Sequence, residues 1–302
     1  MITLVNLSKQ FDHRYVVKDI NVKIKEGEIV GLLGPNGAGK TTTLRMIAGV
    51  LPPSGGKVEI DGNDIELNPA LKKRIGFLPE NNPLYDEMTV EEYLLFWADI
   101  KEVPKNDRQK AIDFVVDSCG IGDVFYRPIA ELSKGYRQRV GLSQAILTKP
   151  DILIFDEPTE GLDPNQRQDI ASLIRSLGKK RTVIISSHVL AELAKIAGRM
   201  IIIHKGAVVA DETPENLRRL GSSSQIIEME VKGARVLSTL KKVDGVIKVT
   251  EEKKNYFVIE ADKKRDIREE LYYLSIKNKW VLLTLVSRDR AIEDVFGKLT
   301  SS

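Results

Sequence analysis

The sequence predicts an α/β fold in which a parallel sheet is interrupted by a helical insertion and followed by a small α+β domain. Short apolar runs alternate with helical patterns over residues 1–220, except between about residues 84 and 145, where strand patterns are missing. After the flexible sequence Gly-Ser-Ser-Ser at 221–224 the order of elements changes. Because 302 residues suit about two domains, we expect one domain over residues 1–220 and a second over residues 221–302.

Two kinds of strand are predicted in the first domain. Residues 2–5, 20–24 and 57–60 alternate apolar and polar side chains, as half-exposed strands of an antiparallel β subdomain do. Four continuous apolar runs suit central parallel strands that are covered on both faces; they are residues 29–33, 152–155, 182–185 and 200–203.

Helices are predicted between and after these strands. Ile170, Leu173, Ile174 and Leu177 form one apolar stripe, and the pair Asp163-Pro164 precedes it as a cap and first-turn residue would. Residues 90–98 and 111–116 carry the main helical patterns of the insertion.

The second domain is predicted to be ferredoxin-like. Its order is strand 226–231, helix 234–242, strands 246–250 and 256–260, helix 267–276 and strand 281–286. A short final helix is expected over residues 291–299.

Composition narrows the functional classes. Hydrophobic residues make up 42% and charged residues 29%, and the net charge of +3 is spread along the chain, so we expect no nucleic-acid partner. The single Cys119 excludes an internal disulfide framework. No stretch approaches the ~20 apolar residues that a membrane span requires, so any membrane role depends on a partner.

A glycine-rich loop over residues 34–41, Gly-Pro-Asn-Gly-Ala-Gly-Lys-Thr, follows the apolar run 29–33. The spacing of glycine, four residues and then Gly-Lys-Thr is that of a phosphate-binding loop. Its glycines let backbone N–H groups surround phosphate oxygens, Lys40 supplies a positive charge, and Thr41 offers a hydroxyl to Mg²⁺. We therefore expect a P-loop NTPase core that binds a nucleoside triphosphate.

Two further segments carry candidate chemistry. The apolar run 152–155 is followed by Asp156 and Glu157. This places the Asp156 carboxylate beside the expected Mg²⁺ and the Glu157 carboxylate where it can polarise an attacking water. Ser133 and Gly135 begin a helix that suits an anion, although an ordinary capped helix explains this segment equally well when it is taken alone.

In order and spacing, these segments resemble the nucleotide-binding domains of ATP-binding-cassette (ABC) transporters. The matching pieces are residues 34–41, Leu-Ser-Lys-Gly-Tyr at 132–136, Asp156-Glu157, Gly-Leu-Asp at 161–163 and His188. The resemblance covers about residues 1–220. Residues 78–85, 132–140 and 290–296 are similar to the export class whose ATPases serve drug, lipid or gliding-motility systems.

The resemblance implies a role for each matching residue. Phe11 is implied to stack on adenine, with Tyr15 as a possible substitute. The residues implied to bind the phosphates of the ATP bound to their own chain are Gly34, Asn36, Gly37, Ala38, Gly39, Lys40, Thr41 and Thr42. Thr41 and Asp156 are implied to hold Mg²⁺, Glu157 to act as general base, and His188 to contact the γ-phosphate, with Lys40 assisting. Ser133 and Gly135 are implied to complete the ATP site of a second nucleotide-binding domain, in a homodimer or a heterodimer, and Asp163 to make contacts across that dimer interface.

Two departures from the family pattern concern the site. Glu80 stands where the family usually has glutamine, and we expect it to remain a Mg²⁺-side ligand and a coupling residue. Lys134 and Tyr136 stand where glycine and glutamine are commoner, and we expect Lys134 to face solvent rather than the triphosphate.

The function predicted is that of the ATP-hydrolysing subunit of an ABC exporter. It would lie at the cytoplasmic face of the membrane, bound to separate integral membrane subunits, with Leu84, Tyr85 and Trp97 as candidate contacts; packing inside the insertion is the alternative, favoured for Trp97. An alternative function is a soluble ABC ATPase that acts on ribosomes or chromosomes. A third is a regulatory subunit that binds ATP without turnover.

Overall fold

The computed structural model describes residues 1–220, 224–262 and 266–288. It divides into two compact units, Met1–Thr213 and Pro214–Ser302. The predicted boundary at 220/221 lies after the first helix of the second unit. The predicted final helix, 291–299, and the sequence at 290–296 lie outside the described residues.

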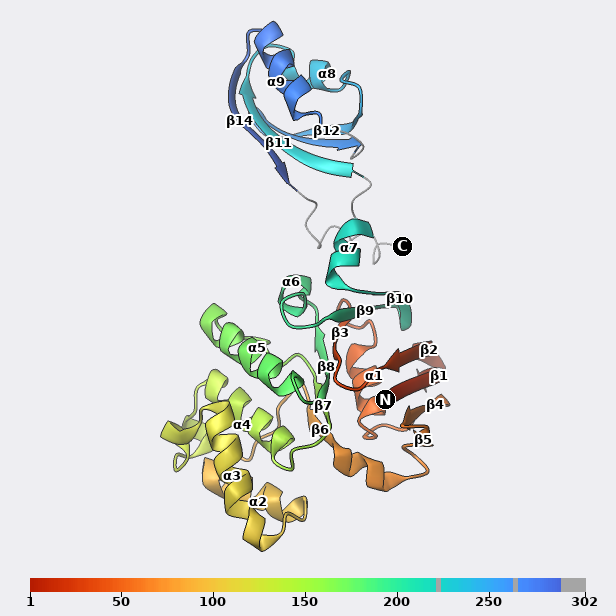
Figure 1. The fold of residues 1–302 in the computed structure, drawn as a ribbon, viewed down its shortest axis with the longest axis vertical. Coiled ribbons are helices and arrows are strands. Elements are labelled where there is room, and N and C mark those ends of the chain that lie inside the picture. Colours follow the sequence, from red (N-terminus) through yellow and green to blue (C-terminus); the bar gives the residue numbers. More distant parts are fainter. Residues whose placement is uncertain (221–223, 263–265, 289–302) are drawn as a thin grey trace. The chain divides into compact units, whose positions relative to one another are not determined.

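A six-stranded sheet is the centre of the first unit (Figure 1). Its strands, in spatial order, are β10 (Ala207–Glu212), β9 (Arg199–His204), β3 (Ile29–Leu33), β8 (Thr182–Ser187), β7 (Ile152–Phe155) and β6 (Ile75–Leu78). All neighbouring pairs are parallel except β10 with β9. Every residue of β7 and β8 is buried, which confirms that the continuous apolar runs form central strands.

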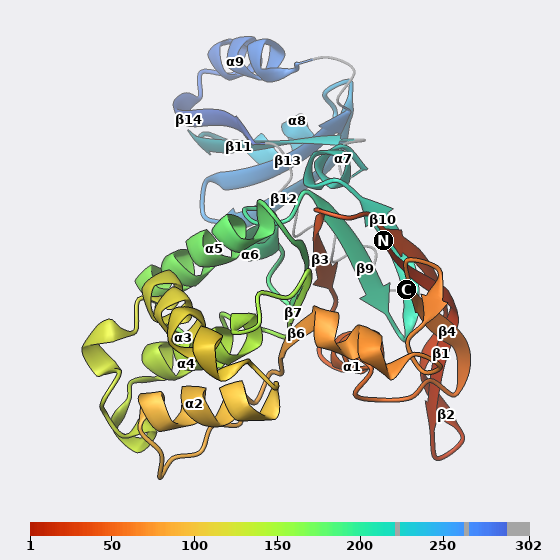
Figure 2. The same ribbon diagram turned by 60° about the horizontal axis from the view of Figure 1, so that its bottom comes forward.

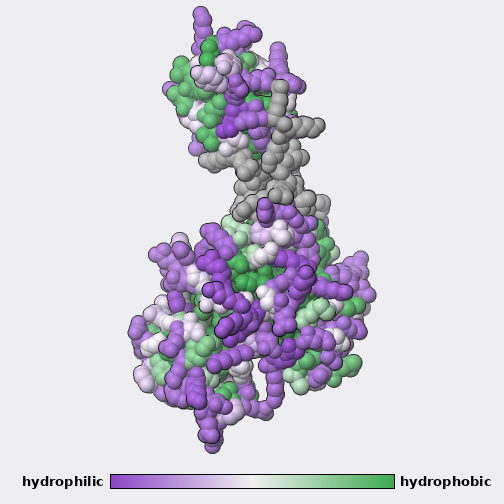
Figure 3. Space-filling model, in the orientation of Figure 1, coloured by the Kyte–Doolittle hydropathy of each residue, from purple (hydrophilic) through white to green (hydrophobic). Residues whose placement is uncertain are grey.

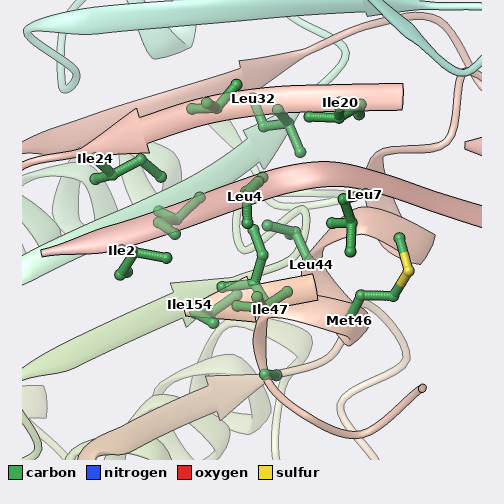
Figure 4. Packing of buried hydrophobic residues seen from close by; sticks show 14 of the residues in the cluster. Ile2, Leu4, Leu7, Ile20, Ile24, Leu32, Leu44, Met46, Ile47 and Ile154 are labelled. Carbon is green, nitrogen blue, oxygen red and sulfur yellow. The ribbon is translucent and has the colours of Figure 1, made fainter. Parts of the chain in front are cut away.

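A second, antiparallel sheet supplies the predicted β subdomain. Its order is β2 (Arg14–Ile24), β1 (Ile2–Phe11), β4 (Gly55–Ile60) and β5 (Asn63–Asp64). Side chains of β1, α1 (Lys40–Ile47) and β7 meet in one apolar core, in which Ile2, Leu44 and Ile154 are at most 1% exposed (Figure 4). Helix α1, which follows the glycine-rich loop, is thereby held between the two sheets.

The helical insertion consists of α2 (Val90–Ile100), α3 (Lys105–Cys119) and α4 (Lys134–Ile146). Figures 1 and 2 show these helices grouped on one side of the six-stranded sheet, with β1, β2 and β4 on the other. Thr89 begins α2 with a capping box to Glu92. Short 3₁₀ turns at Pro69–Arg74, Gly122–Val124 and Ile129–Glu131 connect the elements.

Two helices follow the strands that carry the candidate catalytic residues. Helix α5 (Pro164–Gly178) begins as predicted, because the Asp163 carboxylate accepts hydrogen bonds from the N–H groups of Asn165 and Gln166, both at 3.0 Å. Helix α6 (Leu190–Leu193) follows β8 closely.

The second unit begins with α7 (Pro214–Leu220). Its further elements are β11 (Ser224–Lys232), α8 (Val236–Leu240), β12 (Val246–Lys253), β13 (Tyr256–Asp262), α9 (Arg268–Lys277) and β14 (Val281–Arg288). The sheet order is β12-β13-β11-β14, and its core includes Met229, Phe257 and Leu271.

Hydrophilic residues cover most of the face of the first unit seen in Figure 3, and apolar residues form small separate groups there. Within the described ranges, none of the helices combines the length and apolar character that crossing a bilayer requires.

Candidate functional site

A cavity of about 330 Å³ lies where β3, β6, β7 and β8 end. Its lining consists of Val16, Asn36, Gly37, Ala38, Gly39, Lys40, Thr41, Thr42, Glu80, Glu157, Glu160 and His188. The fold thus brings most of the predicted own-chain residues to one place, since the carboxyl ends of parallel strands share one edge of the sheet.

The glycine-rich loop turns directly into α1. Gly39 caps that helix with a φ of +106°, and a Cβ there would lie 2.7 Å from the carbonyl oxygen of Val16. Glycine is therefore required both by the backbone conformation and by the close approach of β2. No acidic residue occupies the first turn of α1, so its N–H groups and positive dipole end are available to an anion.

Glu157 lies between Lys40 and His188. Its Oε1 atom is 3.3 Å from the Lys40 ammonium, and its Oε2 atom is 3.0 Å from Nδ1 of His188. Both Glu157 and Lys40 are 6% exposed, whereas the His188 side chain is 42% exposed. Lys40 also donates to the carbonyl oxygen of Gly34 at 2.8 Å, which holds its ammonium across the loop.

Ser186 contacts both acidic residues, the carboxylate of Asp156 and the backbone of Glu157, and it was not among the predicted site residues. Its hydroxyl donates to Oδ1 of Asp156 at 2.6 Å and accepts from the N–H of Glu157 at 2.9 Å. Glu157 has a left-handed φ of +46°, a conformation that this hydrogen bond helps to fix. The sequence does carry a signal for this contact, because Ser186 directly follows the apolar run 182–185 and so lies where neighbouring parallel strands end in polar residues.

The oxygen atoms near Thr41 suit a magnesium ion. Oδ2 of Asp156 is buried and has no hydrogen-bond partner, and the Thr41 hydroxyl is 3.4 Å from Oε2 of Glu80. Burial raises the pKa of Asp156, and the hydrogen bond from the Ser186 hydroxyl to Oδ1 acts in the opposite direction. A bound cation would supply the missing partner.

No three His, Cys, Asp or Glu side chains gather into a group that could hold a metal among the described residues. Two carboxylates and a hydroxyl fit Mg²⁺ that arrives with a nucleotide, since Mg²⁺ takes few protein ligands when phosphates supply others.

The predicted adenine contact lies outside the cavity. Phe11 and Tyr15, both described, are 45% and 53% exposed and are not in its lining, which instead includes Val16 from the same hairpin. The Lys9 ammonium lies 5.3 Å from the centre of the Phe11 ring. Lys9 thus lies over one face of the Phe11 ring, and stacking of Phe11 or Tyr15 on adenine stays a prediction.

Ser133, Gly135 and Asp163 are not in the lining of this cavity; Ser133 and Asp163 are exposed, whereas Gly135 is buried. Ser133 caps α4 through a 3.4 Å hydrogen bond from the N–H of Tyr136 and stays exposed. Gly135 lies against the side chain of Gln166 in α5. Lys134 is exposed, as predicted, and its ammonium lies over Gly161, where it occupies the place of a Cβ.

A phosphate loop between a central strand and a helix, with a buried Asp-Glu pair and a histidine at the same sheet edge, defines a P-loop ATPase. The family model described as "ABC transporter" matches residues 17–160. The chain belongs to this family as an ATP-binding subunit. It is 39% identical over 224 residues to the "ABC transporter ATP-binding protein NatA" of Bacillus subtilis (strain 168), covering 72% of this chain and 91% of that protein.

Other comparisons agree. The "Bacitracin transport ATP-binding protein BcrA" of Bacillus licheniformis is 36% identical over 222 residues, 72% of each chain. The solved "Dimeric Structure of MJ0796, a Bacterial ABC Transporter Cassette" has a TM-score of 0.65 and 27% identity, covering 71% of this chain and 99% of that chain. The same cassette, at 26% identity and the same TM-score and coverage, was solved in a post-hydrolysis state bound to ADP and Pi. ATP hydrolysis is therefore the activity of this family and of this chain.

Proposed function

We propose that this protein drives export through separate membrane subunits by closing, with a second nucleotide-binding domain, around two ATP molecules. The observation that carries the proposal is the position of Glu157 between Lys40 and His188 at the end of the phosphate loop. The names of NatA and BcrA, one of them a bacitracin transport protein, support a transporter over a ribosome or chromosome ATPase.

Nucleotide binding would change the partners of Glu157. Lys40 pairs with Glu157, with its ammonium 3.3 Å from Oε1. The β- and γ-phosphates carry more negative charge than one carboxylate and would take over the ammonium. Glu157 would then be free to polarise an attacking water, and His188 would keep its carboxylate in place. Mg²⁺, held by Thr41 and Asp156 with Glu80 nearby, would neutralise charge that develops on the phosphates.

The second half of the site is proposed to come from a partner domain. Ser133 and Gly135 are separated from their own chain's cavity, yet they begin a 13-residue helix that suits an anion. An ATP molecule on the phosphate loop of one chain would meet this helix of the other. The dimeric MJ0796 cassette supports this arrangement.

The membrane partner is proposed to bind beside the Glu80 loop. Tyr85 is 45% exposed and packs edge-on against Phe96 with ring centres 5.4 Å apart. Leu84 is half-buried, and Trp97 is half-buried against Tyr93 and Phe96, so Trp97 belongs to the packing of the insertion. Binding there would place the protein at the cytoplasmic face of the membrane. We also propose that nucleic acid is not a partner.

The second unit is proposed to be a ferredoxin-like accessory domain. Its β-α-β-β-α-β order from β11 to β14 and its sheet order support this. Its job does not follow from the fold.

The test of the proposed function is Glu157→Gln. The amide cannot take a proton from water, so the variant should bind Mg·ATP with wild-type affinity, lose about 100-fold or more of its turnover, and accumulate as an ATP-bound dimer in size-exclusion chromatography. Lys40→Ala is the control, which should lose ATP binding itself. A Glu157→Gln protein that stays monomeric at saturating ATP would refute the sandwich mechanism.

A further inference from the structure

The segment that contains Asp163 is fastened to the segment that contains His188 at two points. Residues 157–163 follow β7, and residues 188–192 follow the neighbouring strand β8. The first contact is between Glu157 and His188, at 3.0 Å. The second lies four residues further along the His188 segment, at Glu192, and the sequence analysis assigned no role to it.

Each carboxylate oxygen of Glu192 holds a different partner. Oε2 accepts a hydrogen bond from the hydroxyl of Thr159 at 2.9 Å, and Oε1 accepts from Nη1 of Arg167 at 2.8 Å. Thr159 is 6% exposed and the Glu192 side chain 21% exposed. Glu192 therefore links the start of the segment 157–163, called the Asp163 loop below, to helix α5, which follows that loop.

Arg167 closes a ring of contacts. Its Nε atom donates to the carbonyl oxygen of Leu162 at 2.8 Å while Nη1 holds Glu192. The loop at residues 159–162 is thus fixed at both ends, by Thr159 and by Leu162. The planar guanidinium reaches two acceptors in fixed directions, which a lysine cannot do.

This ring of contacts borders the reaction site. Thr159, Arg167 and Glu192 line a cavity of about 340 Å³ whose lining also includes Glu157, His188 and Lys134. A displacement of His188 and α6 would therefore be transmitted to the Asp163 loop through Glu192, and the reverse also holds.

We propose that Glu192, with Arg167 and Thr159, is a positioning residue for ATP hydrolysis. It fixes the position of the Asp163 loop relative to His188, so that both are placed for turnover. The proposal rests on the function proposed above, in which Glu157 and His188 serve the chemistry and Asp163 reaches the second nucleotide-binding domain. Because the Arg167 side chain is 43% exposed, the pair contributes little to stability, and its effect should fall on rate.

The experiment measures Mg·ATP hydrolysis, the affinity for a fluorescent ATP analogue and urea unfolding for the full chain and its Glu192→Ala variant. We expect kcat to fall by about 10- to 100-fold, because small misplacements of catalytic groups cost rates of this size. Affinity should stay close to wild type, and the free energy of unfolding should fall by no more than about 1 kcal/mol, the contribution of the lost Thr159 hydrogen bond. Glu192→Gln, which keeps an acceptor oxygen, should recover part of the rate, and Arg167→Lys should lose rate as Glu192→Ala does.

Glu28→Ala is the matched control. Glu28 also pairs with an arginine, Arg199 at 3.2 Å, and its side chain is 26% exposed, but it precedes β3 at the opposite sheet edge from the phosphate loop. Its kcat should not change.

Two outcomes would overturn the proposal. One is a kcat for Glu192→Ala within about twofold of wild type. The other is a loss of kcat that is matched by equal losses of ATP affinity and stability, since that would indicate a structural role. Glu157→Gln is measured in parallel: retained turnover in that variant would refute Glu157 as the base, while the result for Glu192→Ala would still be read from kcat.

Discussion

Ser186→Ala tests how the site holds its two acidic residues, Asp156 and Glu157. The Ser186 hydroxyl is fully buried and serves Asp156 and Glu157 at once, as donor at 2.6 Å and acceptor at 2.9 Å. Alanine fits the space with almost no change in packing. The variant therefore removes two hydrogen bonds and leaves two buried polar groups without partners.

The magnitude follows from those two losses. A hydrogen bond to a charged group contributes about 1.5–3 kcal/mol, and an unsatisfied buried N–H group costs about 1–3 kcal/mol. Because the two contacts share one atom, their losses do not add fully, and we expect a loss of about 3 kcal/mol in the free energy of unfolding of the first unit. Turnover should also fall, since the Glu157 backbone loses the contact that fixes its left-handed conformation.

The assay is urea unfolding followed by tryptophan fluorescence in a Trp280→Phe background. The chain has two tryptophans, and Trp97 in the first unit would then be the only reporter. The midpoint should fall with an unchanged m-value.

Ser143→Ala is the control for Ser186→Ala. Ser143 is equally buried, but its hydroxyl donates to the Arg139 carbonyl one helical turn earlier at 2.8 Å and otherwise meets the weakly polar Cys119 thiol, so its loss should cost under about 1 kcal/mol. Equal destabilisation by the two variants would refute the reasoning.

Three further predictions concern other buried contacts. Burial lowers the pKa of Lys101 from 10.5 to about 8. Between these pH values the unfolded chain binds more protons than the folded one, so the free energy of unfolding measured by urea titration should rise with pH. Lys101→Met should abolish this rise, and a rise that persists in the variant would contradict the assignment to Lys101. Burial raises the pKa of Cys119 to about 11, so the native thiol should not react with a disulfide reagent at pH 8 until urea unfolds the chain; rapid native labelling would count against it. A Cβ on Gly141 would overlap the side chain of Asn82, whose Nδ2 donates to the Arg137 carbonyl at 2.8 Å. Gly141→Ala should therefore lower the free energy of unfolding by about 1–3 kcal/mol. In a double-mutant cycle Asn82→Ala should remove most of this loss, and additive losses would exclude the overlap.

Lys134 and Phe11 show what the local sequence leaves open. Lys134 is exposed, as the sequence predicts, and the fold adds that its ammonium lies over Gly161, which follows a different strand. Phe11 lies outside the cavity lining, which includes Val16 of the same hairpin, and its stacking on adenine stays a prediction. Both details depend on how the loops of separate elements approach one another.

The sequence by itself determined the central strands, the cap at Asp163, the phosphate loop and the Asp156-Glu157 pair. These features are local: the period of apolar residues, the conformational freedom of glycine and the spacing of a few polar groups fix them. Only the tertiary structure showed that Ser186 bonds both the Asp156 carboxylate and the Glu157 backbone, and that Glu192 joins Thr159 to Arg167. A hydrogen-bond partner tens of residues away is chosen by strand order and helix packing, and those are set by the burial of the whole core rather than by any one segment.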